Sequence, residues 1–413
     1  MAKNLHSLAY VSPSFPATPL VFEQNEILGL VELGVDVTIL SCRRSPSAIL
    51  HSFAQQLVPL TRYFSASHFL LGLVRLATRH PICLLSVMWC VIKAIISQPG
   101  RVSKYVGSFA LAVSFYQDGC RQKWQWIHAD FSQGSATTAW FLSQFLNIPF
   151  SSLSHAFDIY SNKPGVRESP GFYAQKMKQS RLIFVEHEFG AKILQQQLPF
   201  DIQDKLQIQR LSVRTNEISA MPFPNSIRDG YILALGTLVE KKGFDLLVRA
   251  IQILVQDGAD LRCAIWGDGP EREYLQSLIA DYDLESRIQL HGAYNQDKLA
   301  EILRGSLFLV MPSRVDSWGD IDGTPTVLFE AMSAARPVVS TDVSGIPEVV
   351  KNGFNGTIVP QNDSQKLSAA IFEFVKDLEH ARQLGVNARS YCERSHSHLV
   401  VSQNLIDQIS ACL

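Results

Sequence analysis

The sequence has no strong excess of either charge and no paired cysteines. Its 413 residues carry 37 Lys and Arg against 38 Asp and Glu, which gives a formal net charge of −1. Nucleic-acid-binding proteins usually show a basic stripe, so this balance argues against that class. The 7 cysteines form no C-x-x-C pair and no ligand-like spacing. They predict a reducing compartment, without structural zinc or a disulfide framework.

Long apolar runs and a leader pattern are also missing. In the most apolar zone, the longest stretch without charge or histidine runs from Pro81 to Ile92. A membrane-spanning helix would need ~18 residues, so no span is predicted. The N-terminus has no long apolar core before a small-residue cleavage site, and we therefore expect a cytoplasmic protein.

Acidic residues are absent between Ser65 and Gln117. Within this zone, residues 66–113 predict two apolar helices separated by Pro81, with basic residues among them. Two interpretations stay open for this insert. In the first interpretation, the insert lies on an anionic membrane surface, which would make the protein peripheral on the inner face of the plasma membrane. Alternatively, it covers a sheet while its basic side chains reach solvent.

Strand and helix patterns alternate through both halves of the chain, which predicts an α/β fold with parallel sheets. We expect two doubly wound, Rossmann-like domains facing a cleft. The predicted parts are an N-terminal domain at 1–218 with a helical insert at about 66–113, a linker at 219–228, a C-terminal domain at 229–385, and a helical tail at 386–413. A return of this tail to the N-terminal domain stays open.

The loop after the first predicted strand, Pro13 to Pro19, contains no glycine. It is therefore no G-x-G-x-x-G dinucleotide loop, and a nicotinamide-dependent oxidoreductase is disfavoured.

The stretch from 311 to 350 has the clearest local pattern. A short apolar strand is followed by a loop with three aspartates, and Thr324 and Pro325 predict the N-cap and first position of a helix. The first N–H groups of that helix, at Thr326, Val327 and Leu328, predict a phosphate site.

Two carboxylates accompany this helix. Asp322 precedes it, and Glu330 is expected on its polar flank. From spacing alone, an acidic loop before an ordinary capped helix is the favoured interpretation.

Longer segments resemble a known family. WGDGPEREYLQSLIADYDLESRIQLHGAY, LFLVMPS, GTPTVLFEAM and ARPVVSTDVSGIPEVVKNGFNGTIVP are similar to the C-terminal domain of retaining GT-B glycosyltransferases of family 4, or glycosyltransferase group 1. IHADF, IPFSSLSHAFDIY and FPATPLVFEQNEILGL resemble the N-terminal domain of the branch that builds exopolysaccharides and colanic-acid-like polymers. The resemblance covers most of the chain and is weakest over 43–120 and 195–228.

The resemblance implies a nucleotide-sugar donor held mainly by the C-terminal domain, with no metal and no cofactor. Glu330 matches the second member of the family's carboxylate pair, which binds the ribose hydroxyls, and Asp322 matches the first, near the donor sugar. Lys242 matches the basic residue that steadies the departing diphosphate, and His155 matches a histidine facing the donor sugar. The remaining implied donor contacts are Gly236, Thr237, Thr326, Val327 and Leu328. Asp158 and Thr18 are candidates for the acceptor side or its loop.

Three departures from the family pattern stand out. Thr237 occupies a position where the family usually has arginine. Asp322 replaces glutamate and is one methylene shorter, about 1.5 Å of reach. Pro19-Leu20-Val21-Phe22 replaces S-E-T-F.

The sequence therefore predicts a retaining, metal-independent glycosyltransferase of polysaccharide biosynthesis. It would transfer a sugar from a nucleotide diphosphate to a glycan or lipid-linked glycan acceptor, and nucleic acid is not expected as a partner. The alternatives are a weakly active or non-catalytic relative that binds glycan or a partner, and a sugar-nucleotide epimerase.

Overall fold

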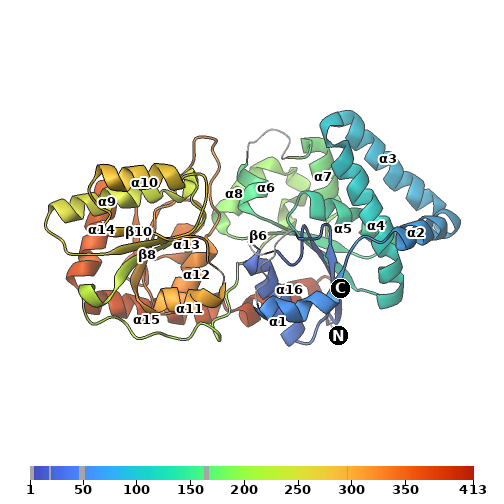
Figure 1. Cartoon of the computed structure of the whole chain (residues 1–413). Helices are drawn as coiled ribbons and strands as arrows, with labels where there is room; N and C mark the ends of the chain where they lie inside the picture. Colours follow the sequence, from blue (N-terminus) through green and yellow to red (C-terminus); the bar gives the residue numbers. More distant parts are fainter. Residues whose placement is uncertain (1–3, 18–19, 46–51, 162–166, 295) are drawn as a thin grey trace. The chain divides into compact units, whose positions relative to one another are not determined.

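A computed structural model describes residues 4–17, 20–45, 52–161, 167–294 and 296–413. The chain forms two compact units (Figure 1). The N-terminal unit contains Met1–Arg210 and Leu399–Leu413, and the C-terminal unit contains Leu211–His398.

The boundary between the units falls earlier than residue 218, where the sequence analysis places it, and the predicted linker at 219–228 lies inside the C-terminal unit. Two contacts explain this. The ring of His396 donates a hydrogen bond to the carbonyl of Leu211 over 2.9 Å. The buried guanidinium of Arg336 donates to the carbonyls of Met221 and Pro222.

The N-terminal unit is built on a parallel sheet with the order β3-β2-β1-β4-β5-β6-β7. Its strands are β1 (Ser7–Ser12), β2 (Asp36–Ser41), β3 (Thr61–Arg62), β4 (Trp126–Asp130), β5 (Phe150–Ser154), β6 (Leu182–Val185) and β7 (Leu206–Ile208). The central strands are buried on both faces, as expected when helices cover both sides of a parallel sheet.

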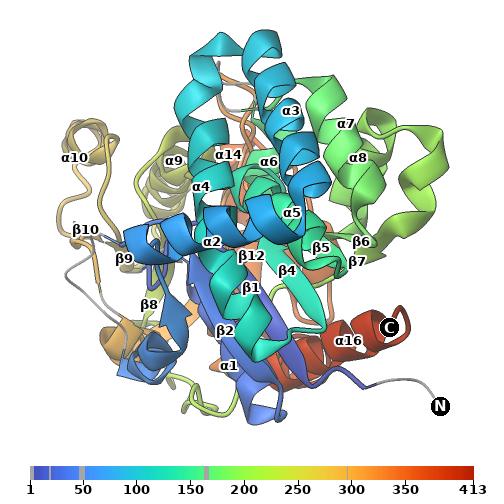
Figure 2. The same ribbon diagram turned by 90° about the vertical axis from the view of Figure 1, so that its right-hand side faces the viewer.

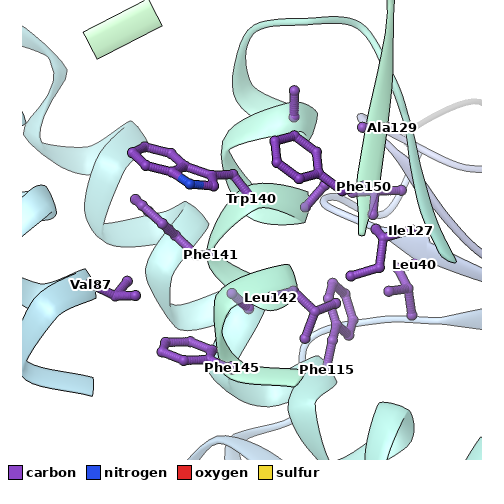
Figure 3. Close-up of a cluster of buried hydrophobic side chains, with 14 of the residues drawn as sticks. Leu40, Val87, Phe115, Ile127, Ala129, Trp140, Phe141, Leu142, Phe145 and Phe150 are labelled. Carbon is purple, nitrogen blue, oxygen red and sulfur yellow. The ribbon is translucent and has the colours of Figure 1, made fainter. Parts of the chain in front are cut away.

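Helices cover each face of this sheet. They are α1 (Val21–Glu32), α2 (Ala66–Arg79), α3 (Pro81–Ser97), α4 (Val102–Gln122), α5 (Gly134–Leu146), α6 (Ala156–Tyr160), α7 (Pro170–Gln179), α8 (Glu188–Gln197) and α16 (His398–Ser410). Figure 3 shows the core around α5, where Phe141 and Phe145 lie on the side of Val87 of α3. Phe115 of α4 lies on the side of Leu40 of β2 and Ile127 of β4. A second core on the other face includes residues of α1 and α16.

The insert consists of α2, α3 and the first half of α4. As expected, α2 and α3 are separated at Pro81, which occupies the first position of α3, where no N–H is needed. The third helix, α4, extends to Gln122, beyond the expected end of the insert at residue 113. Among the described residues no single helix meets the length and apolarity needed to cross a membrane, although α2 and α3 do so as a pair bent by 118°.

The last helix returns to the N-terminal unit (Figure 2). Leu405 and Ile409 of α16 are fully buried in the core that includes α1. The hydroxyl of Ser402 donates to the carbonyl of Glu26 over 2.9 Å. The predicted tail at 386–413 is therefore divided, because its first residues belong to α15 of the C-terminal unit.

The C-terminal unit has a parallel sheet with the order β10-β9-β8-β11-β12-β13. Its strands are β8 (Tyr231–Leu235), β9 (Cys263–Trp266), β10 (Ile288–Leu290), β11 (Ser306–Met311), β12 (Val338–Thr341) and β13 (Gly356–Val359). Its helices are α9 (Phe244–Gln256), α10 (Arg272–Asp281), α11 (Leu299–Arg304), α12 (Thr326–Ser333), α13 (Ile346–Val349), α14 (Ser364–Lys376) and α15 (Leu378–Ser395). In Figure 1, α9 and α10 lie on one side of this sheet and α12 and α15 on the other.

Candidate functional site

The strand order of the C-terminal sheet reverses between β8 and β11. In open parallel sheets, such a switch point is where loops beyond the strand ends leave room for a ligand. The two loops here touch closely. A Cβ built on Gly243 would lie 2.1 Å from the carbonyl oxygen of Pro312, and Gly243 has a φ of +65°. Glycine is therefore required for the loop after β8 to reach the loop after β11.

Two predicted site residues meet at this switch point. The ammonium of Lys242 lies 2.7 Å from Asp322 Oδ2. Lys241, which the sequence analysis did not single out, lies 3.4 Å from Asp322 and 3.3 Å from Asp320. Burial opposes the charge of Lys241, but Asp322 and Asp320 outweigh it and raise the pKa of this lysine. The result is a charge-matched, partly buried cluster.

The beginning of α12 differs from the expected cap. The helix starts at Thr326, and Pro325 is its N-cap, with φ −59° and ψ 127°, so the expectation of a Thr324 cap is wrong. The N–H of Leu328 donates to the Pro325 carbonyl over 3.1 Å, which removes it from the predicted free donors. Thr326 and Val327 occupy the first two helical positions, where an α-helix supplies no carbonyl partner.

Glu330 is buried rather than on a polar flank, with 4% of its surface exposed. Its carboxylate accepts a hydrogen bond of 2.7 Å from Gln296, a residue that sequence reasoning missed. Burial raises the pKa of this carboxyl above its ordinary value. Near the same sheet edge, the rings of Trp266 and His291 stack with centroids 4.1 Å apart.

Gly236 and Thr237 follow β8. A Cβ on Gly267 would lie 1.8 Å from the Gly236 carbonyl, so the loops after β8 and β9 pack backbone against backbone. A Cβ on Gly236 would lie 3.4 Å from Lys242 Cε. Thr237, which replaces the family's arginine, is exposed. It adds no positive charge beside Lys242.

His155 is locked at the ends of three neighbouring strands in the N-terminal unit. It follows β5, while Asp130 ends β4 and Glu186 follows β6. Its Nε2 lies 2.5 Å from Asp130 Oδ1, and its Nδ1 bonds to Glu186. Burial opposes the imidazolium, but the two carboxylates raise the pKa of His155 well above its ordinary value. Both ring nitrogens are thus occupied, and this environment favours the charged imidazolium.

Further buried acids surround this histidine. Glu26 accepts a hydrogen bond of 2.9 Å from Tyr10 and one of 2.8 Å from Gln209, and burial raises its pKa to about 7. Burial and the neighbouring charge of Asp130 raise the pKa of Glu23 well above its ordinary value. The sequence analysis missed Asp130 and Glu186, although both stand at the carboxyl ends of strands, where functional side chains gather.

The two acceptor-side candidates have different outcomes. Asp158 is buried, and its Oδ2 accepts from the N–H groups of Ser132 and His155 over 3.0 and 3.1 Å. Burial raises its pKa to about 6. Thr18 lies outside the described residues.

The aspartates of the loop after β11 are engaged by the protein. Asp316 Oδ1 accepts from the N–H groups of Trp318 and Asp320, each over 2.8 Å. Within the described part of the chain, no group of three or more His, Cys, Asp or Glu residues is placed to hold a metal ion. Metal independence itself stays a prediction.

Comparison with known proteins addresses the C-terminal unit first. The family description "Glycosyl transferases group 1" matches residues 221–391. The chain contains a group 1 glycosyltransferase domain. This domain includes every residue of the Lys242, Asp322 and Glu330 site.

Curated relatives agree with the exopolysaccharide branch. WcaL of Escherichia coli, named for colanic acid biosynthesis, is 30% identical over 210 residues, which are 51% of this chain and 52% of WcaL. The amylovoran biosynthesis glycosyltransferase AmsK of Erwinia amylovora is 29% identical over 204 residues, 48% of this chain and 50% of AmsK. The chain thus spans about half the length of these relatives in the matched segments.

Solved structures define the fold of the whole chain. Anabaena HepE in complex with UDP aligns with a TM-score of 0.70 at 15% identity, covering 98% of this chain and 100% of HepE. Sucrose-phosphate synthase from Thermosynechococcus elongatus aligns with a TM-score of 0.70 at 16% identity, covering 99% and 100%. Both units have the Rossmann-like topology of the GT-B fold, which confirms the predicted fold class.

Proposed function

We propose that this protein is a retaining glycosyltransferase that moves a sugar from a nucleotide diphosphate to a hydroxyl of a glycan or lipid-linked glycan. The observation that carries the proposal is the ion pair of Lys242 and Asp322 at the switch point of the group 1 domain, together with Glu330, which is buried on α12 after the same loop. The names of WcaL and AmsK support a role in polysaccharide biosynthesis, and the UDP complex of HepE supports a nucleotide donor.

In the proposed mechanism, the donor diphosphate competes with Asp322 for Lys242. The 2.7 Å ion pair would open, and Lys242 would then stabilise the charge that develops on the leaving diphosphate. Asp322 Oδ2 would then be free to accept hydroxyls of the donor sugar, while Oδ1 lies 3.4 Å from Lys241. The first N–H groups of α12, at Thr326 and Val327, would complete the diphosphate contacts.

Glu330 would bind the ribose. Its buried carboxylate accepts a hydrogen bond from Gln296 and is influenced by the charge of Arg214, and its remaining lone pairs could accept hydroxyl donors. Thr237 provides no charge at the position where the family has arginine, so Lys242 would act with less support on the diphosphate.

His155 would not act as a general base. A carboxylate at each ring nitrogen favours the imidazolium, which has no free lone pair, so the ring would have to lose a proton before it could accept one. We assign it a fixed positive charge at the sheet edge, which orients the loop after β5. No metal is required in this scheme, because Lys242 and the helix supply the positive charge.

The test is a panel of UDP-, GDP- and ADP-sugars with and without EDTA. We expect turnover of at least one donor, insensitivity to EDTA, and loss of turnover in Asp322→Asn. The anomeric configuration of the product, read by NMR, tests retention. Absence of turnover with every donor would contradict the enzyme assignment.

Exposed Thr237 favours a second candidate, a relative that binds donor or glycan without turnover. Binding of a nucleotide sugar with no transfer and no hydrolysis would support this reading. Appearance of an isomerised sugar nucleotide would instead identify an epimerase.

We also propose that the insert lies on an anionic membrane. Apolar side chains on α2 and α3 are widely exposed, including Leu70, Ile82 and Ile96, and the segment has no acidic residue. Ile82→Ser with Ile96→Ser should reduce co-flotation with anionic liposomes, whereas Phe200→Ser, an exposed apolar change outside the insert, should not. Failure of the wild-type chain to bind at any salt concentration would exclude membrane association.

A further inference from the structure

The N-terminal unit contains a cavity of about 690 Å³ at the switch point of its own sheet. The strand order reverses between β1 and β4, and the cavity is lined by the residues that follow these strands, together with the starts of α4 and α5. The volume is in the range of small-molecule sites, and its position is the one that parallel sheets offer to ligands.

One wall of this cavity is cationic. Arg43 follows β2, Arg101 precedes α4, and Lys104 lies in the first turn of α4. Partial burial, together with the charges of Arg101 and Arg43, lowers the pKa of Lys104. Glu168 acts in the opposite direction and also lies 2.5 Å from Lys176. Arg101 and Arg43 disfavour the charged form of Lys104, and an anion among the three side chains would offset this effect.

A second wall is the beginning of α5, a helix of 13 residues. Gln133, Gly134 and Ser135 line the cavity there. The hydroxyl of Ser135 is buried, with 4% of the residue exposed, and among the described residues it has no hydrogen-bond partner. A helix start with an unsatisfied hydroxyl is suited to phosphate oxygens.

The third wall contains the carboxyl group of Asp158, which would repel an anion but can accept a hydrogen bond from a hydroxyl group. Asp158 lines the cavity, and its Oδ1 is buried without a hydrogen-bond partner in the described structure, while Oδ2 is engaged by Ser132 and His155. A carboxylate accepts hydrogen bonds from hydroxyls. Phe157, which is 48% exposed, also lines the cavity and offers an aromatic face.

We propose that this cavity binds a saccharide bearing a phosphate or diphosphate. The phosphate lies among Arg43, Arg101 and Lys104 and the start of α5, and sugar hydroxyls reach Asp158. Treating this ligand as the acceptor rests on the proposed function, but the binding site itself does not.

The test measures binding to the full chain by calorimetry with four probes: glucose 1-phosphate, inorganic pyrophosphate, octyl phosphate and glucose. We expect glucose 1-phosphate to bind tightest and glucose not to bind. Arg43→Gln combined with Lys104→Gln should weaken glucose 1-phosphate by about tenfold or more, because charge-assisted hydrogen bonds are lost. Both residues are exposed, so folding should persist. Lys93→Gln, an exposed lysine on α3 outside the cavity, should have no effect.

Equal affinity of the wild type and the double variant for glucose 1-phosphate would contradict the proposed phosphate site. Binding of pyrophosphate or octyl phosphate as tight as glucose 1-phosphate would overturn the saccharide assignment. A parallel titration with UDP separates the two proposals. If glucose 1-phosphate binds and UDP does not, the proposed donor site is contradicted and the cavity is supported. If UDP binds and glucose 1-phosphate does not, the cavity proposal is contradicted and the donor site stands.

Discussion

In both units, loops meet at the switch point of the parallel sheet, but the charged side chains at the two switch points differ. At the switch point of the C-terminal sheet, Lys241 and Lys242 face Asp320 and Asp322, and each charge has a partner. At the N-terminal switch point, Arg43, Arg101 and Lys104 line one cavity, whose described lining also includes Asp158. A common topology thus determines where a ligand can bind, while loop residues determine what must move to admit it.

The difference has a mechanistic consequence. In the proposed mechanism, a diphosphate in the C-terminal unit would have to displace a carboxylate, which would couple donor binding to the separation of Lys242 from Asp322. In the N-terminal unit, the proposed anion would enter a cavity that three cationic side chains already line. Near that cavity, the carboxylates of Asp130 and Glu186 contact the buried ring of His155.

The largest effect is expected where charge is buried most deeply. Asp130→Asn removes one of the two carboxylates that contact His155 and should lower the unfolding free energy of the N-terminal unit by about 3 kcal/mol, because one buried ion pair is broken while Glu186 remains. Hydrogen exchange within the N-terminal unit measures this. Asp201→Asn breaks an exposed pair with Lys178 and should change nothing measurable. A negligible effect of Asp130→Asn would show that His155 is neutral.

A smaller effect should separate the two lysines of the C-terminal unit. Lys242→Gln should lower kcat by about 10²–10³, as expected when one preorganised donor to a developing negative charge is lost. Lys241→Gln, which removes a cation shared by Asp320 and Asp322, should lower kcat far less. Steady-state kinetics with the best donor compares them. Equal losses would mean that both lysines contact the diphosphate.

The pH dependence of stability should differ between the units. Burial raises the pKa of Glu26 from 4.5 to about 7, and hydrogen bonds from Tyr10 and Gln209 oppose this only partly. The folded state therefore keeps a proton that the unfolded state has lost, and stability falls as pH rises from about 4.5 to 7. His128, Asp130 and His155 also face this group.

Glu26→Gln cannot titrate and should flatten this slope by up to about 1.4 kcal/mol per pH unit. Urea unfolding followed between pH 5 and 8 measures the change. Glu32→Gln, an exposed change on the same helix, is the control. An unchanged slope in Glu26→Gln would place the titration elsewhere in the unit.

Much of the fold could be predicted because alternating apolar strands and periodic helices are local signals. The sequence patterns predict a strand at 5–13, a helix at 20–33 and a strand at 36–42, and β1, α1 and β2 begin and end within two residues of these ranges. The two-residue strand β3 was missed, since so short a segment has no periodicity. The unit boundary at Arg210 was missed because it depends on Arg336 and His396, which bind the segment from far along the chain.

The site could be predicted only in part. Lys242 and Asp322 came from the resemblance, and their contact depends on the strand order that the sequence does not display. Glu330 was expected on a polar flank because helical periodicity cannot show Gln296 packing over it. The basic cavity was missed altogether, since Arg43 and Lys104 lie far apart in sequence and neither belongs to a motif.

The central claim is that the C-terminal switch point binds a nucleotide diphosphate through Glu330 and Lys242. Calorimetric titration of UDP into the wild-type chain and into Glu330→Gln tests it most directly, with the exposed Glu379→Gln as the matched control. We predict wild-type-like affinity for Glu379→Gln and affinity at least about tenfold weaker for Glu330→Gln, through loss of charge-assisted bonds to the ribose. Equal UDP affinity in all three proteins would contradict the account.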